Sequence, residues 1–272
     1  MAQFPGPVPP ESRLKGLWLK VLVTVLCVLL VAPSLVVMPM SFSGSKFLQF
    51  PPEAWSTQWY DAYFASIEWR EATWISLRAA ILTVLVATPI GTMAAYGLHV
   101  SNSKLATFIG LLLIMPLMVP IILIAVGVFF LYARMGLNNT LAGLVLAHSV
   151  LAIPFVLITV TAGLKSYDMN QELVARSLGA NRLKAFFNVT LPQIRLSVFS
   201  GALFAFITSL DEVVVAIFIA RGDSSTLPRR MFSFLRDQVD PTSAAISTLL
   251  IVISIILLIV NLTLQSSEKQ EH

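Results

Sequence analysis

The chain has 272 residues, of which 57% are hydrophobic and only 12% are charged, and its formal net charge is +4. Its mean hydropathy is +0.83. Because a soluble domain usually carries about 25% charged residues, this composition excludes an ordinary soluble globular protein. The basic residues are spread over the segments between apolar runs, which does not suggest a nucleic-acid partner.

Six apolar runs are long enough to cross a membrane, which takes about 20 mostly apolar residues. Every backbone group in lipid needs an internal partner, so we expect each run to be a helix and the chain to be an all-α membrane protein. Ten-residue strands of alternating polarity, which would indicate a barrel, are absent from the sequence. The expected transmembrane helices are 17–40, 74–98, 105–133, 141–163, 196–220 and 243–265.

The first run and its flanks determine the expected orientation. Residues 17–40 follow basic residues and lack an evident cleavage site, so we interpret them as a retained signal anchor. With a cytoplasmic N-terminus, ten of the 18 Lys and Arg residues fall in cytoplasmic segments and seven fall outside, with Arg78 inside the second run. The positive-inside rule then places both termini in the cytoplasm, as tails of 1–16 and 266–272 around a membrane domain of 17–265.

Two segments on the expected outer side differ from the runs. Residues 41–73 are rich in Trp and Tyr, which suits a belt at the lipid headgroups, a short interfacial helix or a docking surface for a soluble partner. Residues 221–242 carry both signs of charge and predict a short amphipathic helix. Each proline inside an apolar run is expected to remove a hydrogen bond and kink its helix. These prolines are Pro89, Pro116, Pro120 and Pro154.

Residues 166–190, between the fourth and fifth runs, have a different local chemistry. Asp168 can cap a helix start, with Gln171 three residues on as its capping-box partner. Gly179 suits the left-handed residue that ends such a helix, and Asn181 can cap a second short helix. Pro192 suits the first turn of the next run. The pattern predicts helix, tight turn, helix and return to the membrane, all on the cytoplasmic side.

The second short helix has a largely apolar face in a basic setting. Leu183, Phe186 and Phe187 lie on that face at helical spacing. An exposed apolar patch of this kind marks a docking surface for another protein. The alternative is a hairpin that lies on lipid, and the residues alone favour neither interpretation.

The same stretch resembles the cytoplasmic loop in the membrane-spanning subunits of binding-protein-dependent ATP-binding-cassette (ABC) importers. That family's pattern is E-A-A, three residues, G, nine residues, I, one residue and L-P. The spacing from Gly179 to Pro192 matches this pattern in full, with Val189 and Leu191 at the intermediate positions. In the family this loop is the coupling helix, which sits in a cleft of the ATPase subunit and passes its closure to the spans. We therefore name residues 166–190 the coupling segment.

The sequence departs from the pattern at the family's glutamate. Counting back from Gly179, that position holds Leu173, and Glu172 stands one place earlier. The resemblance leaves two alternatives open: Glu172 replaces the glutamate through a small rotation, or the family's salt bridge to the ATPase is lost and Leu173 weakens coupling. The residues to which it gives a role in ATPase coupling are Glu172, Ala175, Gly179, Ala180, Leu183, Phe186, Phe187 and Pro192.

The resemblance extends over most of the chain. Residues 209–241 resemble the corresponding part of the second permease subunit of spermidine/putrescine importers, as do the length and the six-run plan. It implies the type I ABC importer transmembrane-domain fold in the bacterial inner (plasma) membrane. The implied partners are a second homologous permease, two ATP-binding-cassette ATPase subunits, a periplasmic or extracellular solute-binding protein and membrane lipid.

No G-x-x-x-x-G-K-[ST] phosphate loop occurs in the sequence, and no set of metal ligands or paired nucleophile and base stands out. We therefore expect a non-catalytic transport subunit that uses neither a cofactor nor a metal. ATP hydrolysis would belong to the partner ATPase subunits.

Asp211 and Glu212 lie inside the fifth apolar run, roughly 15 Å from its outer end by helical rise. An ionised side chain there costs about 2.5–3.5 kcal/mol, so such residues usually face a wet cavity or the bundle interior. In one interpretation Asp211, together with Glu212, attracts a cationic substrate, as the resemblance implies. In the other, the pair makes structural contacts with Arg78, His148 or the partner subunit. Arg78 alone would snorkel to the headgroups, and His148 would be a packing residue.

Three functions compete at this point. The first is an importer permease for putrescine or spermidine. The second is the same machine with another small organic solute, such as an amino-acid derivative. The third is a membrane scaffold or channel without ATP coupling.

Overall fold

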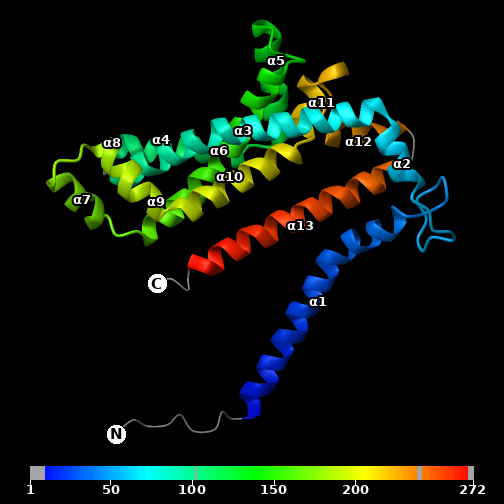
Figure 1. The fold of residues 1–272 in the computed structure, drawn as a ribbon, viewed down its shortest axis with the longest axis horizontal. Helices are drawn as coiled ribbons and strands as arrows, with labels where there is room; N and C mark the ends of the chain where they lie inside the picture. Colours follow the sequence, from blue (N-terminus) through cyan, green and yellow to red (C-terminus); the bar gives the residue numbers. More distant parts are fainter. Residues whose placement is uncertain (1–9, 102, 238–240, 269–272) are drawn as a thin grey trace. The chain divides into compact units, whose positions relative to one another are not determined.

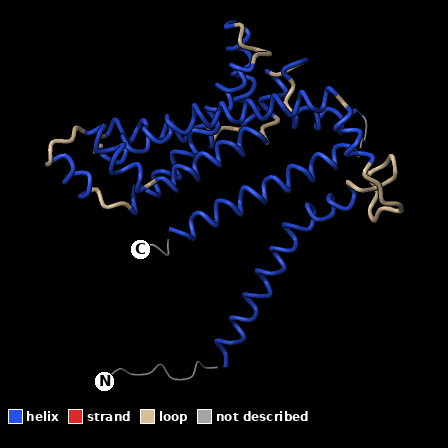
Figure 2. The backbone as a smooth tube through the Cα atoms, in the orientation of Figure 1, coloured by secondary structure: helices blue, strands red, loops and turns tan. Residues whose placement is uncertain are grey.

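The structure, a computed structural model, describes residues 10–101, 103–237 and 241–268. Within these residues the backbone forms helices joined by loops, apart from an isolated antiparallel bridge between Ser43 and Trp55 (Figure 2). The chain divides into two compact units, the described residues of 1–63 with 239–252 and those of 64–238 with 253–272. The groups that bear on function lie in the second unit.

Four helices are long and apolar enough to cross a membrane by themselves. They correspond to the first, second, fourth and sixth expected runs. These helices are α1 (Pro10–Met40), α3 (Ile67–Val100), α6 (Leu141–Ser166) and α13 (Thr242–Glu268). Two further helix pairs pass the same test but are sharply bent, so the described residues give four spans, or up to six if each bent pair is one span.

The third run, expected as one helix over 105–133, is broken. It forms α4 (Lys104–Ile114), a 3-10 turn (Met115–Leu117) and α5 (Ile121–Met135), with a bend of 100°. Pro116 lies in the 3-10 turn and Pro120 directly precedes α5. Since proline lacks a backbone N–H and clashes with the preceding turn, two prolines four residues apart end one helix and start another. Pro89 and Pro154, in contrast, remain inside α3 and α6.

The expectation of a continuous fifth helix over 196–220 is wrong. The helix α10 (Arg195–Leu210) stops before Asp211, and α11 (Val214–Ile219) begins three residues later. Before α10, the chain passes through α9 (Leu191–Gln193), and the direction changes by 80° between the two.

Three helices, α3, α6 and α10, pack side by side and form the core of the second unit (Figure 1). Their contacts are made by small residues, which let helix backbones approach closely where lipid offers no hydrophobic driving force. A Cβ atom added at Gly91 would lie 2.7 Å from Val156, and one at Gly201 would lie 3.2 Å from the same residue. Val156 of α6 is therefore enclosed between α3 and α10, and this close packing sets the positions of all three helices.

Different elements lie at the two ends of this three-helix core. One end carries α7 (Asn170–Ser177), α8 (Arg182–Ala185) and a π-helical segment (Phe186–Thr190), and α12 (Leu227–Asp237) lies toward the other (Figure 1). The amphipathic helix predicted within 221–242 is confirmed as α12. Its Arg230 forms an ion pair with Glu68 and lies 5.5 Å from the centre of the Trp69 ring, which fastens α12 to the start of α3.

In the first unit, the aromatic segment after α1 folds into a loop followed by α2 (Gln58–Ala65). Tyr60 shares a hydrogen bond of 2.8 Å with Ser41, and the Trp59 indole donates to the Ser43 carbonyl at 2.7 Å. Trp55 is 70% exposed. The short helix expected in this segment is present, with part of its aromatic surface used to close the loop.

Candidate functional site

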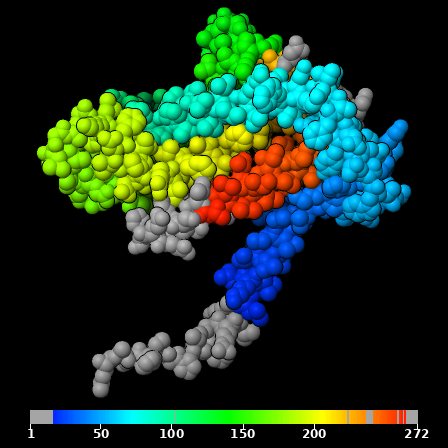
Figure 3. Space-filling model, viewed as in Figure 1, coloured from blue at the N-terminus to red at the C-terminus, as the bar shows by residue number. Residues whose placement is uncertain are grey.

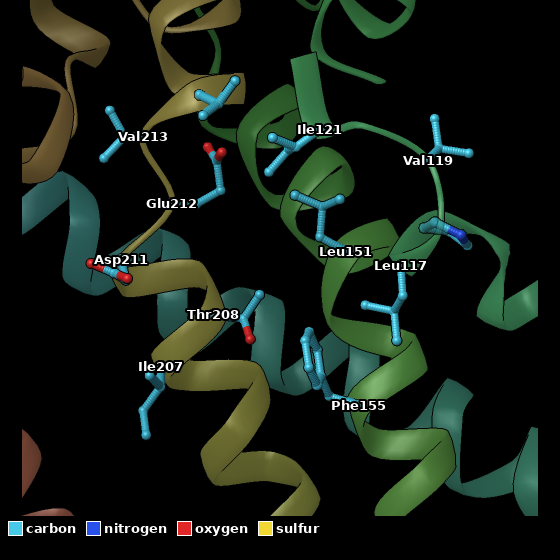
Figure 4. Close-up of a pocket in the computed structure, with 12 residues that line it drawn as sticks. Leu117, Val119, Ile121, Leu151, Phe155, Ile207, Thr208, Asp211, Glu212 and Val213 are labelled. Atoms are coloured by element: carbon cyan, nitrogen blue, oxygen red, sulfur yellow. The ribbon is translucent and has the colours of Figure 1, made fainter. Parts of the chain in front are cut away.

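The break after α10 separates the two adjacent acids. Asp211 is exposed, whereas Glu212 is only 6% exposed. Figure 4 shows that their carboxylates point in different directions. The Asp211 carboxylate makes no hydrogen bond or ion pair with any described residue, so it is the acid that a ligand can reach.

Glu212 is held by the helix that it precedes. Its two carboxylate oxygens accept hydrogen bonds from the backbone N–H of Val215 at 2.8 Å and of Ala216 at 3.0 Å. The first N–H groups of a helix have no partner within it, and a side-chain acceptor at this position satisfies them. Glu212 therefore caps α11 and stabilises the break, which explains why the fifth run is not one helix.

A buried polar chain connects Glu212 to the three-helix core. His148 Nε2 lies 3.5 Å from Glu212, and His148 Nδ1 shares a hydrogen bond of 2.7 Å with Ser209. Ser209 in turn donates to Thr83 Oγ1 at 3.3 Å. His148, Ser209 and Thr83 come from α6, α10 and α3. Of the two acids, it is therefore Glu212 that makes the structural contact with His148. Arg78 lies over the Trp74 ring at 5.0 Å instead.

A pocket of about 740 Å³ lies beside the break. Figure 4 shows its wall, to which Leu117 and Ile121 contribute from the broken third run and Phe155 from α6. Except for Asp211, Glu212 and Thr208, its lining residues are apolar. Because Glu212 is occupied, Asp211 is the one lining carboxylate in the described pocket without a protein partner.

A second pocket, of about 940 Å³, continues along the same two helices. On α6 the first pocket is lined by Leu151 and Phe155 and the second by Thr159, four residues further on. Residues three or four apart share one helix face, so the two pockets follow the same face of α6 and are together named here the α6–α10 groove. Phe155 of the first pocket and Phe204 of the second stack with ring centres 6.4 Å apart.

The coupling segment has most of the expected local structure. Gly179 has the left-handed φ of +95°, and Asn181 accepts a hydrogen bond from Lys184 N at 2.8 Å, so both predictions are confirmed. Asp168 accepts instead from Asn170 N at 3.0 Å, and Met169 occupies the cap position of α7. The π-helical segment after α8 was not predicted.

Exposed apolar side chains occur along the coupling segment among exposed basic ones, although not all the expected residues contribute. Leu183 and Phe187 are exposed, and so are Leu173 and Leu178. Figure 3 shows this yellow-green end of the chain as an open surface. Phe186, expected on the exposed face, is buried.

Glu172 does not lie on the surface, contrary to the expectation that it replaces the family's glutamate there. It is 1% exposed, and it accepts hydrogen bonds from the Tyr96 hydroxyl at 2.6 Å and the Thr190 hydroxyl at 2.7 Å. The family's glutamate position, Leu173, is exposed. Of the other expected coupling residues, Ala175 and Ala180 are half-buried, and Gly179 and Pro192 are exposed.

Among the described residues, no group of three or more His, Cys, Asp or Glu side chains could hold a metal ion. The site thus has two parts. One is the α6–α10 groove with the unpaired carboxylate of Asp211, and the other is the coupling segment, which the buried Glu172 joins to the core.

Comparison with known proteins identifies the family. The description "Binding-protein-dependent transport system inner membrane component" matches residues 87–268, more than half of the chain. The chain belongs to this family. It is a permease subunit of an ABC importer, and in such systems separate subunits hydrolyse ATP.

Two relatives cover most of the permease. It is 27% identical over 227 residues to the spermidine/putrescine transport system permease protein PotC of Escherichia coli (strain K12), over 84% of this chain and 86% of the relative. It is 30% identical over 229 residues to the putrescine transport system permease protein PotI of the same strain, over 82% and 81%. Members of the family generally work with a binding protein, a second permease and ATPase subunits.

Solved structures show the same fold. A bacterial ABC transporter involved in the import of the acidic polysaccharide alginate matches with a TM-score of 0.69 and 15% identity, over 97% of this chain and 99% of the other. An amino acid ABC transporter with histidines matches with a TM-score of 0.53 and 18% identity, over 78% and 95%. At these identities the likeness concerns the fold alone.

Proposed function

We propose that this permease moves a polyamine such as putrescine or spermidine into the cell. The observation that carries the proposal is the Asp211 carboxylate, which lines an otherwise largely apolar pocket and has no partner among the described residues. A polyamine combines ammonium groups with methylene chains, and so it matches an acid beside apolar walls. The Phe155 ring can add a cation–π contact. The printed names of the two relatives support the same cargo.

Another small organic solute, such as an amino-acid derivative, could use the same machine. Asp211 favours a cation that carries no carboxylate of its own, because like charges close together in a weakly polar pocket repel each other. The pocket therefore favours a polyamine over an amino-acid derivative.

We further propose a type I arrangement of six spans, in which α4 with α5 forms the third span and α10 with α11 forms the fifth, and the N-terminus lies in the cytoplasm. The tails 1–16 and 266–272 then lie on the same side as the coupling segment. The balance of ten basic residues against seven supports this orientation. A second permease would supply the opposite wall of the α6–α10 groove, and a binding protein would deliver cargo from the outer side.

The coupling segment is proposed as the docking site for an ATPase subunit. Leu178, Leu183 and Phe187 present an exposed apolar surface, which is characteristic of a protein interface. The family's loop pattern ending at Pro192 supports the same role. Gly179→Pro should abolish retention of the ATPase, since proline cannot adopt a φ of +95°. An assembled complex that contains no ATPase would instead favour the scaffold or channel.

Uptake by the complete system tests the cargo. Cells that express all subunits would be given labelled putrescine or spermidine, with wild type, Asp211→Asn and the charge-retaining Asp211→Glu side by side. We expect ATP-dependent uptake that falls with Asp211→Asn and partly recovers with Asp211→Glu, at equal levels of assembled complex. Assembled wild type that takes up neither amine, but does take up amino-acid derivatives, would replace the proposed cargo with the second one.

A further inference from the structure

Glu172 lies where the coupling segment meets the end of α3. One of its carboxylate oxygens accepts a hydrogen bond from Tyr96 at 2.6 Å, and the other accepts one from Thr190 at 2.7 Å. Glu172 belongs to α7, Tyr96 to α3 and Thr190 to the π-helical segment. A single carboxylate thus joins three elements that are far apart in the sequence.

These two bonds are costly to break because of their surroundings. A carboxyl group out of contact with water is stable only when its oxygens are hydrogen-bonded. Losing either hydroxyl would leave a buried oxygen of Glu172 without a partner, and water has little access to a side chain that is 1% exposed. The bonds therefore restrain the coupling segment far more than a surface contact would.

Tyr96 holds the segment in a second way. Its ring lies 4.6 Å from the ring of Phe186, which is 3% exposed. Ala185, the residue before Phe186, is fully buried as well. The inward surface of the segment is thus packed on α3, while Leu183 and Phe187 remain exposed on the outward surface.

The helix α3 leads from this junction to the break at Asp211. Thr83 precedes Tyr96 by 13 residues on the same uninterrupted helix, which is roughly 20 Å at 1.5 Å per residue. Thr83 accepts the hydrogen bond from Ser209, near the end of α10, and so belongs to the buried chain that reaches Glu212. One continuous helix, with Pro89 between Thr83 and Tyr96, therefore contacts the elements at both ends.

We propose that the bonds of Glu172 with Tyr96 and Thr190 make the coupling segment and α3 move as one body, so that a displacement imposed on the segment reaches the break at Asp211. Glu172 is then a positioning residue inside the permease and not a contact with the ATPase. This inference rests on the proposed docking of an ATPase on the coupling segment.

The test uses the complete complex in proteoliposomes, with binding protein and labelled putrescine. Tyr96→Phe removes one hydroxyl and keeps the ring against Phe186. Tyr132→Phe is the matched control, because Tyr132 is 7% exposed against 8% for Tyr96 and its hydroxyl makes no hydrogen bond with a described residue. Thr190→Val removes the other hydroxyl at nearly constant volume. Retention of the ATPase on affinity purification and the amount of cargo moved per ATP are both measured.

For Tyr96→Phe and Thr190→Val we expect the ATPase to be retained and the cargo moved per ATP to fall about fivefold or more, at the lower end of usual coupling between sites. Tyr132→Phe should match wild type. Unchanged cargo per ATP in both variants would overturn the inference. If the variants lose both the ATPase and the folded permease, Glu172 has a purely structural role, which would overturn it as well. If wild type itself retains no ATPase, the proposed docking fails first.

Discussion

The permease contains two buried glutamates that each accept two hydrogen bonds, but the donors lie at different separations along the sequence. Glu212 accepts from backbone N–H groups three and four residues ahead. Glu172 accepts from hydroxyl groups 76 and 18 residues away. The first glutamate therefore shapes the chain locally, whereas the second holds separate elements together.

This difference indicates what each acid contributes to transport. Glu212 ends one helix and starts the next, and so exposes the adjacent Asp211 to the α6–α10 groove. Glu172 fixes the coupling segment to α3 and leaves the outward contact to apolar side chains such as Leu183. In both regions the buried acid positions a neighbour, and our proposals assign the contact with cargo or with the ATPase to that neighbour.

The largest effect is expected from Glu172→Leu. The change leaves the hydroxyls of Tyr96 and Thr190 without their acceptor, and it removes two hydrogen bonds to an acid, which together contribute about 3 kcal/mol or more. Thermal unfolding in detergent should show a large loss of stability, and transport should fall to background. Leu173→Ala, at the exposed neighbouring position, serves as the control for stability. Equal stability of Glu172→Leu and Leu173→Ala would show that the long-range bonds matter little.

Glu212→Gln should have an intermediate effect. An amide has one acceptor oxygen, so one of the N–H groups of Val215 and Ala216 loses its partner, at about 1–2 kcal/mol. Thermal unfolding checks this loss, with Asp211→Asn as the matched adjacent variant, which should keep wild-type stability. A greater destabilisation by Asp211→Asn than by Glu212→Gln would reverse the roles assigned to the two acids.

The smallest effect is expected from Glu68→Gln, which removes the charge of an exposed acid. Its side chain is 68% exposed, and exposed ion pairs contribute about 1 kcal/mol or less. Its partner Arg230 keeps the contacts with the rings of Trp69 and Phe234. Uptake and thermal stability should stay near wild type, which makes this variant the baseline for the buried acids. A loss as large as that of Glu212→Gln would mean that α12 depends on charge and not on packing.

Features set by neighbouring residues could be predicted from the sequence. Four apolar runs are helices, Gly179 is left-handed and Asn181 caps α8, because length, backbone freedom and a short acceptor side chain act within a few residues. The bend near Pro116 and Pro120 follows from proline in the same way.

Features that depend on distant partners could not be predicted. Nothing in the sequence near Glu172 indicates that Tyr96, 76 residues earlier, supplies its hydrogen bond. The family pattern has its acid one place later, at the exposed Leu173, and so the burial of Glu172 had no local signal. The break at Asp211 is a milder case, because an acid pair inside an apolar run indicates a special environment but not that Glu212 would cap a new helix.

The most direct measurement is cargo protection of single cysteines at the two adjacent acids. Since the chain has one native cysteine, Cys27, the variants Asp211→Cys and Glu212→Cys would be made in a Cys27→Ser background. The assembled complex would be treated with a cationic thiol reagent, with and without putrescine, and labelling of this subunit would be followed. The account predicts that Asp211→Cys is labelled and that putrescine slows this labelling, whereas Glu212→Cys stays unlabelled. Equal labelling at both positions, or protection by putrescine at Glu212→Cys alone, would contradict it.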